Sequence, residues 1–493
     1  MNVRGRRLKK QGDEVTAFTS SMAFDDRIAI HTVRTNMAHM ISLIESGEVS
    51  KQVGSSILAF LSRAPTSAPR GVLAEDYHQY LEQAAVDSLG VEVAGYLNLG
   101  KSRNDQVATA IRMELRGRII TLAKSLGALQ KSVLGVAQRN GEAMVPGYTH
   151  LQHAQPVTLA HHLFAYFDCL QRDVDRLCEL YARVNLSPMG SAALAGTSVR
   201  VDRRMVASLL GFDGLVANAM DGVSSRDFVV ETLCCASMIM LDASRISEEL
   251  ILWSSSEFGY VELSDEYAAS SSIMPQKKNA VAAETARAKC GSVLGALMAV
   301  CAIMKAMPFS YNLDLQETTA HLWRALDDTV DSVNILGGML ATTKFKIERL
   351  ASSTKNDYST ATALANYLVV RERISFRQSH AIVGELVRIS VEGRVPFEST
   401  VVSQLPKVSS QIAKRIKIGR SKLRSILDPA RSLSSIVSSG GSNPGMIPGE
   451  LQARTLQLGR NKERVSKMES SIVSAQSRLS EALRSDTKEV KNR

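Results

Sequence analysis

Residues 270–279 concentrate side chains that could act on a carboxylate substrate. They read Ser-Ser-Ser-Ile-Met-Pro-Gln-Lys-Lys-Asn, and an apolar stretch typical of a helix follows them. Hydroxyl groups, backbone N–H groups and two ammonium groups therefore gather at a predicted helix N-terminus, an arrangement suited to carboxylate binding. The same surroundings could lower the pKa of a serine hydroxyl enough for its deprotonated form to act as a base. A polar capping loop is the alternative interpretation of these residues.

Three further polar segments, residues 100–106, 145–156 and 186–197, are interrupted by Gly or Pro in the same way. Each lies between long apolar-periodic stretches, where functional loops tend to occur. His150, in the second of them, could transfer protons, although a structural histidine at a helix end has the same local pattern. We interpret His161 and His162, on the next predicted helix, as structural.

Long helices must position these segments. From Asp105 onward apolar residues recur every three or four positions, which is the spacing of a helix stripe; they are Val107, Ile111, Leu115, Ile119, Leu122, Leu126, Leu129 and Val133. Asn104 and Asp105 supply N-cap chemistry at its start. Similar stripes follow Pro156 and cover roughly residues 228–258 and 279–304. Helices this long rarely bury their whole stripe within one subunit, so we predict an all-α fold with a central long-helix bundle that oligomerises.

Changes of period and composition divide the chain into four predicted parts. Residues 1–100 form an N-terminal helical domain, and residues 101–352 form the central bundle with its catalytic loops. Residues 353–431 form a C-terminal helical domain. Residues 432–493 begin as a Ser/Gly/Pro-rich loop and end as a charged helix or tail.

Composition excludes several classes of protein. Of 493 residues, 45% are hydrophobic and 22% are charged, values typical of globular proteins. The longest uncharged apolar run, residues 293–304, is shorter than the about 20 residues of a membrane-spanning helix. The N-terminus is basic but lacks the apolar core of a secretory signal, so we expect a cytoplasmic protein without membrane association.

Charge and cysteine placement argue against two more classes, nucleic-acid-binding proteins and proteins held by disulfides or zinc. The net charge of +10 belongs mainly to residues 1–12, 407–431 and 460–493, and no basic stripe is interleaved with aromatic residues. Nucleic-acid binding is therefore not expected. None of the six cysteines forms a C-x-x-C pair. We interpret them as reduced core thiols and expect no metal site.

Residues 270–279 resemble the signature loop of the fumarase/aspartase superfamily, Ser-Ser-x-Met-Pro-x-Lys-x-Asn, whose members release fumarate from succinyl-type substrates. Other segments resemble the argininosuccinate lyase family in particular. They read Gly-Lys-Ser-Arg-Asn-Asp-Gln-Val at 100–107, Pro-Gly-Tyr-Thr-His-Leu-Gln-x-Ala-Gln-Pro at 146–156 and Tyr-Asn-x-Asp-Leu-Gln-Glu at 311–317. Shorter matches lie at 188–191 and 225–228, and the similarity extends over roughly residues 18–442.

The resemblance implies a three-domain lyase whose bundle assembles into a homotetrameric helical core with active sites shared between subunits. It also implies a reaction without cofactor or metal. The substrate, 2-(Nω-L-arginino)succinate, would give L-arginine and fumarate reversibly, the last step of arginine biosynthesis and a step of the urea cycle.

The resemblance also implies roles for single residues. Ser271 aligns with the serine that removes the Cβ proton, and Lys277 with a lysine that offsets the charge developing on the carboxylate. Thr149 and His150 align with the pair that binds substrate and supports proton transfer to the leaving nitrogen. The positions that align with substrate-binding residues are Ser21, Ser102, Arg103, Asn104, Asn279, Tyr311 and Gln316.

Such residues fit the chemistry. The proton to be removed is weakly acidic, and its loss places a second negative charge on the neighbouring carboxylate. Positioned donors must stabilise that charge, and losing one typically costs about 3–4 kcal/mol. A general acid for the leaving nitrogen contributes roughly 10²–10⁴ in rate.

The chain departs from the family pattern at four places. Ser270 replaces a glycine, Ala280 replaces a proline, and Asn98-Leu99 replaces His-Thr. Thr319 replaces the lysine expected three residues after Gln316 and so removes a cation from substrate binding. Two alternatives therefore stay open. One is a fumarate-releasing lyase for adenylosuccinate or another N-succinyl substrate, and the other is a catalytically silent, crystallin-like structural protein.

Overall fold

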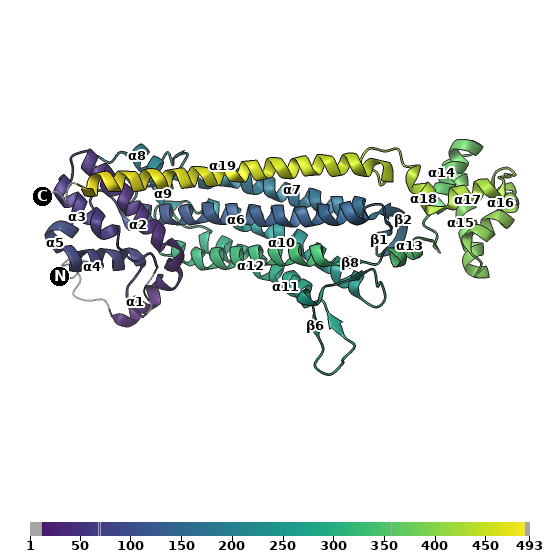
Figure 1. Ribbon diagram of the computed structural model, residues 1–493, viewed down its shortest axis with the longest axis horizontal. Coiled ribbons are helices and arrows are strands. Elements are labelled where there is room, and N and C mark those ends of the chain that lie inside the picture. Colours follow the sequence, from purple (N-terminus) through teal and green to yellow (C-terminus); the bar gives the residue numbers. More distant parts are fainter. Residues whose placement is uncertain (1–11, 68, 70, 356, 489–493) are drawn as a thin grey trace.

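The computed structural model describes residues 12–67, 69, 71–355 and 357–488, so most of the basic segment 1–12 lies outside the described part. The described chain is predominantly helical, as predicted. Figure 1 shows an elongated body in which the longest helices run along the long axis. The first helices gather at one end of this body, and a compact group of later helices lies at the other.

The N-terminal helices form one end of the body. They are α1 (Asp13–Thr19), α2 (Met22–Glu45), α3 (Lys51–Leu61), α4 (Tyr77–Leu89) and α5 (Val91–Ala94). The Asp76 side chain caps α4 by accepting a 2.6 Å hydrogen bond from the Gln79 N–H, which satisfies a donor that the helix leaves free. The buried side chains of these helices form an apolar cluster that also includes Met189, Val206 and Leu210.

Five long helices form the central bundle, and their shared apolar faces make the largest buried cluster. They are α6 (Arg103–Asn140), α7 (Leu159–Val184), α10 (Asp227–Ser254), α11 (Val281–Met304) and α12 (Asp314–Thr342). The predicted stripe from Asp105 lies within α6. The N-cap residue is Ser102, whose hydroxyl accepts from the Asn104 N–H, so the predicted capping role is wrong for Asn104. It is confirmed for Asp105, which completes a capping box.

Residues 145–156, predicted as an irregular polar segment, are instead largely strand. The antiparallel strands β1 (Met144–Thr149) and β2 (Gln152–Thr158) join through His150 and Leu151, and a bulge lies between Pro146 and Tyr148. Six two-residue strands form three more pairs. They are β3 (Leu186–Ser187) with β4 (Gly214–Leu215), β5 (Val261–Glu262) with β8 (Lys344–Phe345), and β6 (Ala269–Ser270) with β7 (Lys278–Asn279).

The compact far group has its own apolar cluster, which runs from Leu364 to Leu427. Its helices are α14 (Ala361–Glu372), α15 (Phe376–Gly393), α16 (Phe397–Ile412) and α17 (Arg420–Leu427). The connecting elements are α8 (Arg203–Leu210), α9 (Ala219–Ser224), α13 (Ile347–Lys355), α18 (Pro429–Ser434), η1 (Asp265–Tyr267) and η2 (Pro444–Met446). The four-part division of the chain stays a prediction.

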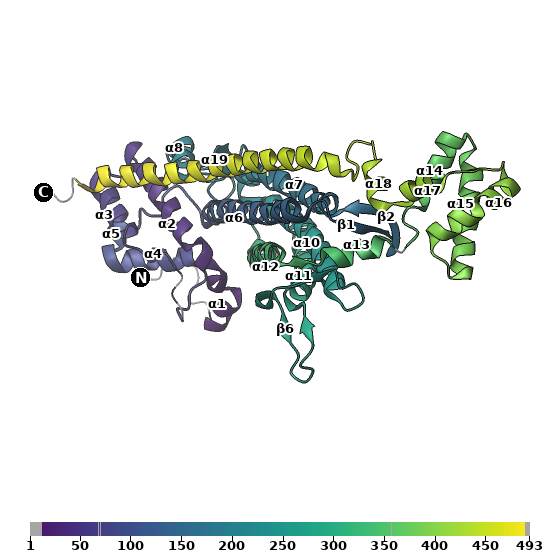
Figure 2. The same ribbon diagram turned by 45° about the vertical axis from the view of Figure 1, so that its right-hand side comes forward.

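The last helix, α19 (Ile447–Lys488), runs back along the bundle to the N-terminal end (Figures 1 and 2). Ion pairs join it to the bundle, including Arg464 with Asp175 and Lys124 with Glu469, each 2.6 Å. Its apolar side chains Val465, Ala475 and Leu479 are buried. Residues 447–488 are therefore packed against the bundle along one face.

The structure bears on two predictions, the burial of the cysteines and the lack of a membrane-spanning helix. Four of the six cysteines are buried thiols, but Cys234 and Cys301 are exposed, so the prediction of a core position is wrong for these two. By length and composition alone, α6 and α11 could each cross a membrane. Buried core helices satisfy the same criterion, and 61% of the apolar window of α6 is buried, against 22% for α11.

Candidate active site

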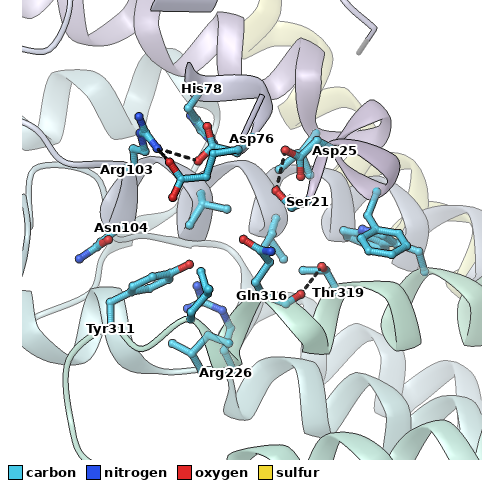
Figure 3. A pocket seen from close by; sticks show the side chains of 18 residues that line it. Ser21, Asp25, Asp76, His78, Arg103, Asn104, Arg226, Tyr311, Gln316 and Thr319 are labelled. Atoms are coloured by element: carbon cyan, nitrogen blue, oxygen red, sulfur yellow. Dashed lines mark hydrogen bonds and ion pairs between the residues drawn. The ribbon is translucent and has the colours of Figure 1, made fainter. Parts of the chain in front are cut away.

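A cavity lies where the N-terminal helices meet the bundle (Figure 3). Its walls come from the start of α2, the segment before α4, the start of α6, the residue before α10 and the first turns of α12. Five of the predicted substrate-binding residues line it, namely Ser21, Arg103, Asn104, Tyr311 and Gln316. These residues are up to 295 positions apart in sequence, and helix ends bring them together.

Ser21 and Asp25 form one wall of the cavity. The Ser21 hydroxyl donates a 2.9 Å hydrogen bond to Oδ2 of Asp25, and the Tyr77 N–H donates another of 2.9 Å to the same oxygen. Burial raises the pKa of the Asp25 carboxyl to about 7, against the lowering effect of these two hydrogen bonds. Asp25 was not predicted as a site residue, because its local sequence suggests only a helix start.

An acidic pair faces the cavity beside Arg103. Nη1 of Arg103 lies 2.8 Å from Oε2 of Glu75 and 3.3 Å from Oδ2 of Asp76. Arg103 is thus held by two carboxylates, and Figure 3 shows it beside Asp76. His78 lies behind this pair, and burial lowers its pKa, which favours the neutral imidazole. Carboxylates at this wall favour a cationic group on the ligand.

Arg226 lies on the opposite wall and was missed as a site residue, although its Ser-Arg-Asp-Phe segment matched the family pattern. Its side chain is buried, and Nη1 donates to the carbonyl oxygens of Ser225 at 2.8 Å and Val223 at 3.3 Å. Burial lowers the pKa of Arg226 to about 10, so it stays charged at neutral pH. Tyr311 lies next to it, and burial raises the pKa of the Tyr311 phenol.

Gln316 and Thr319 complete the wall formed by α12. Nε2 of Gln316 donates a 2.9 Å hydrogen bond to the carbonyl oxygen of Thr19, which ties α12 to the segment before α2. The Thr319 hydroxyl donates to the carbonyl oxygen of Gln316 at 2.7 Å. The position where the family pattern has a lysine therefore faces the cavity with a hydroxyl and a methyl group.

The Asp105 carboxylate links the start of α6 to the segment around Gly190. It accepts hydrogen bonds from the N–H groups of Ser102 at 3.0 Å, Gly190 at 3.0 Å and Ala192 at 2.8 Å. Gly190 has φ +85°, and a Cβ there would meet the Arg203 side chain at 2.6 Å, so glycine is required. Ser102 thus caps the helix, while Arg103 and Asn104 reach the cavity.

Thr149 and His150 do not line this cavity. They lie exposed at the tip of the β1–β2 hairpin, where Thr149 pairs with Gln152 across a two-residue turn. The turn residues His150 and Leu151 have φ values of 56° and 57°. This left-handed conformation is strained for residues other than glycine, and such strain is concentrated at functional sites.

Ser271, Lys277 and Asn279 lie apart from both groups. They belong to the β6–β7 segment, whose loop projects away from the bundle in both ribbon views (Figures 1 and 2). The Ser271 hydroxyl accepts hydrogen bonds from the N–H groups of Met274 at 3.1 Å and Ile273 at 3.4 Å. These donors would stabilise negative charge on its oxygen.

The two lysines of the loop have different surroundings. Lys278 is anchored, because its ammonium lies 2.6 Å from both the Asp265 carboxylate and the carbonyl oxygen of Leu263. Lys277 is exposed on the loop. One chain therefore presents three separate groups of predicted site residues: the cavity, the hairpin tip and the projecting loop.

Comparison with known proteins gives consistent results. The family described as Lyase matches residues 5–295, and the family described as Argininosuccinate lyase C-terminal matches residues 358–434. The argininosuccinate lyase of Methanocaldococcus jannaschii is 39% identical over 471 residues, which cover 94% of this chain and 96% of that protein. The argininosuccinate lyase of Methanothrix thermoacetophila is 41% identical over 485 residues, covering 98% and 99%. Among solved structures, EDDS lyase in complex with formate has a TM-score of 0.89 at 26% identity and covers 98% of this chain and 97% of that one.

Proposed function

The chain belongs to the argininosuccinate lyase family, and on that premise we propose that it converts 2-(Nω-L-arginino)succinate reversibly into L-arginine and fumarate. The observation that carries the proposal is the cavity between the N-terminal helices and the bundle. It gathers five of the seven residues that the family resemblance assigns to substrate binding, namely Ser21, Arg103, Asn104, Tyr311 and Gln316. The reaction would complete arginine biosynthesis and, where one operates, the arginine-forming step of a urea cycle.

In the proposed reaction, Ser271 removes a proton from the succinyl carbon next to the one that carries the leaving nitrogen. The electron pair left behind moves into the adjacent carboxylate, whose second negative charge Lys277 and Asn279 stabilise. Collapse of this intermediate breaks the carbon–nitrogen bond and forms the double bond of fumarate. Thr149 and His150 support delivery of a proton to the departing guanidino nitrogen, so arginine leaves in its protonated form.

We further propose that three chains of a homotetramer contribute to each active site. Support comes from the separation of the three groups of site residues, since each group needs the others for the proposed chemistry. A second support is α11, whose apolar window is only 22% buried and whose Met298 is 68% exposed. An exposed apolar helix face of this kind is typical of a protein–protein interface. We propose the cytoplasm as the compartment of the assembly.

A direct assay tests the proposed function. Purified protein is incubated with argininosuccinate, and fumarate is followed by its ultraviolet absorbance, with adenylosuccinate in a parallel reaction. Fumarate from argininosuccinate supports the proposal. Fumarate from adenylosuccinate alone would replace it with the alternative lyase, for which Thr319 in the cavity wall is the favouring observation. No fumarate from either substrate would favour a silent, structural protein.

A further inference from the structure

A chain of hydrogen bonds holds the base of the β1–β2 turn. The Tyr148 hydroxyl lies 2.7 Å from the Tyr260 hydroxyl and 3.1 Å from Nε2 of His153. Nδ1 of His153 lies 2.8 Å from Oδ2 of Asp357. The Tyr148 and His153 rings also meet edge to face, with their centroids 5.0 Å apart. We call Tyr260, Tyr148, His153 and Asp357 the hairpin tether.

Each hydrogen bond of the hairpin tether can be given one donor and one acceptor, starting from the Asp357 carboxylate. An ionised carboxylate only accepts, so Asp357 fixes the proton of His153 on Nδ1. In the neutral imidazole Nε2 of His153 then accepts from the Tyr148 hydroxyl, whose oxygen is left to accept from the Tyr260 hydroxyl. Burial and the contact with Tyr260 raise the pKa of Tyr148, so its hydroxyl stays protonated and can donate a hydrogen bond. Both hydrogen-bond partners of the Tyr148 hydroxyl are side chains of this chain, the buried Tyr260 and the exposed His153.

Both ends of the hairpin tether are anchored in the body of the protein. Tyr260 is 3% exposed, and its backbone exchanges 2.8 Å hydrogen bonds with the carbonyl oxygen of Trp253 and the N–H of Lys346. At the other end, Oδ1 of Asp357 accepts a 2.9 Å hydrogen bond from the Ser359 N–H. The hairpin tether therefore joins the end of α10 to the segment that leads into α14, with the hairpin between them.

The hairpin tether sits directly behind the strained turn. Tyr148 immediately precedes Thr149, and Tyr148 pairs across the hairpin with His153. The two turn residues between the strands, His150 and Leu151, both have positive φ. A backbone of this kind persists only where its surroundings hold it. The hairpin tether supplies that hold at the nearest pair of side chains.

We propose that His153 is a positioning residue, which together with Asp357 fixes Tyr148 and so the turn that presents Thr149 and His150. The inference rests on the proposed function for the roles of Thr149 and His150. His153 occupies the one position of the 146–156 motif that the family pattern leaves unspecified, so no resemblance assigns it. Its effect passes through the backbone of the turn and needs no contact with substrate.

Substitutions at His153 separate its two hydrogen bonds. His153→Ala removes both, His153→Asn places an amide N–H near Asp357, and His153→Gln places an amide near Tyr148. We expect His153→Ala to lower kcat about 10- to 100-fold, because small misplacements of reacting groups cost this much. KM should stay within about threefold, since the cavity that binds substrate is untouched. Each amide variant should recover part of the loss.

A matched control uses another histidine–carboxylate pair. Nε2 of His162 lies 2.7 Å from Oε2 of Glu249 on the bundle, away from the hairpin turn. His162→Gln should change the melting temperature without lowering kcat. If His153→Ala kept kcat within about twofold of the unchanged protein, or if His162→Gln lowered kcat equally, the positioning role would be refuted.

Hydrogen–deuterium exchange gives a readout that does not depend on turnover. In the full-length protein, His153→Ala and Asp357→Ala should both speed exchange at residues 148–152 and leave exchange in α6 and α7 unchanged. Unaltered exchange at residues 148–152 would overturn the inference even in a protein that released no fumarate. Absence of turnover in the unchanged protein would count against the proposed function alone.

Discussion

The Ser21 hydroxyl donates a 2.9 Å hydrogen bond to the carboxylate of Asp25, one helical turn further along α2. This pair places an unusually weak carboxylic acid inside the substrate cavity. Burial raises the pKa of Asp25 to about 7 from an ordinary 3.8, so the folded protein holds this proton at pH values where the unfolded chain has lost it. Stability contributed by the neutral acid is therefore present at low pH and declines as the pH rises from about 4 to about 7.

Asp25→Asn should abolish that decline. Relative to the unchanged protein, the variant should gain on the order of 2–4 kcal/mol in unfolding free energy between pH 4.5 and pH 7.5. Denaturant unfolding at the two pH values measures the difference. Asp26→Asn, an exposed neighbour on the same helix, is the control and should show no comparable gain. A difference between Asp25→Asn and the unchanged protein that did not vary with pH would contradict the burial effect.

Ser271→Ala should remove most of the lyase activity. Within the part of the chain that the structure describes, the hydroxyl accepts hydrogen bonds from its own loop, so its loss should leave the melting temperature and the assembly unchanged. Loss of a general base costs roughly 10²–10⁴ in rate. Fumarate release under saturating substrate measures the effect, and Ser272→Ala, the next serine of the triple, is the matched control. Near-normal turnover by Ser271→Ala would refute the assignment of the base.

Helix periodicity made much of the bundle predictable. The apolar positions from Val107 to Val133 recur at the helical spacing, and all of them fall within α6. Local pattern did not reveal the β1–β2 hairpin. Pro146 and Pro156 face each other across it, and a bulge next to Gly147 interrupts the alternation that marks a strand. The hairpin is held from outside, for instance by the 2.7 Å hydrogen bond from the Thr158 N–H to the Ser442 hydroxyl.

Local sequence pattern also failed to predict part of the site and the position of the last helix. Asp25 and Arg226 became site residues only through partners far away in sequence, such as Tyr77 and Tyr311. The amphipathic pattern of residues 447–488 indicates a helix but not its destination. Pairs such as Arg464 with Asp175, separated by 289 positions, determine where it lies. Long-range pairs of this kind leave no local signal in a single sequence.

Thr319→Lys should strengthen the binding of argininosuccinate. Thr319 faces the cavity beside Gln316, and its short side chain offers no positive charge to a substrate carboxylate. A hydrogen bond to a charged group contributes about 1.5–3 kcal/mol, so KM should fall by roughly 10-fold or more. Steady-state kinetics measures the change. Thr319→Met has a similar length without the charge and is the control; equal KM values for the two variants would exclude a charge effect.

Mixed assemblies test whether the three groups of site residues meet between chains. Ser271→Ala disables the projecting loop, and Gln316→Ala disables the cavity, so each variant alone should release little fumarate. In a tetramer containing both, some sites would combine an intact loop from one chain with an intact cavity from another, and activity should reappear. Two affinity tags allow the mixed assembly to be isolated for the fumarate assay.

Ser271→Ala mixed with Lys277→Met is the matched control. Both changes lie on the same loop, so every site of this mixture has a damaged loop. If the first mixture stayed as inactive as the second, each site would have to be built within a single chain, and the projecting loop would then have to reach the cavity of its own subunit.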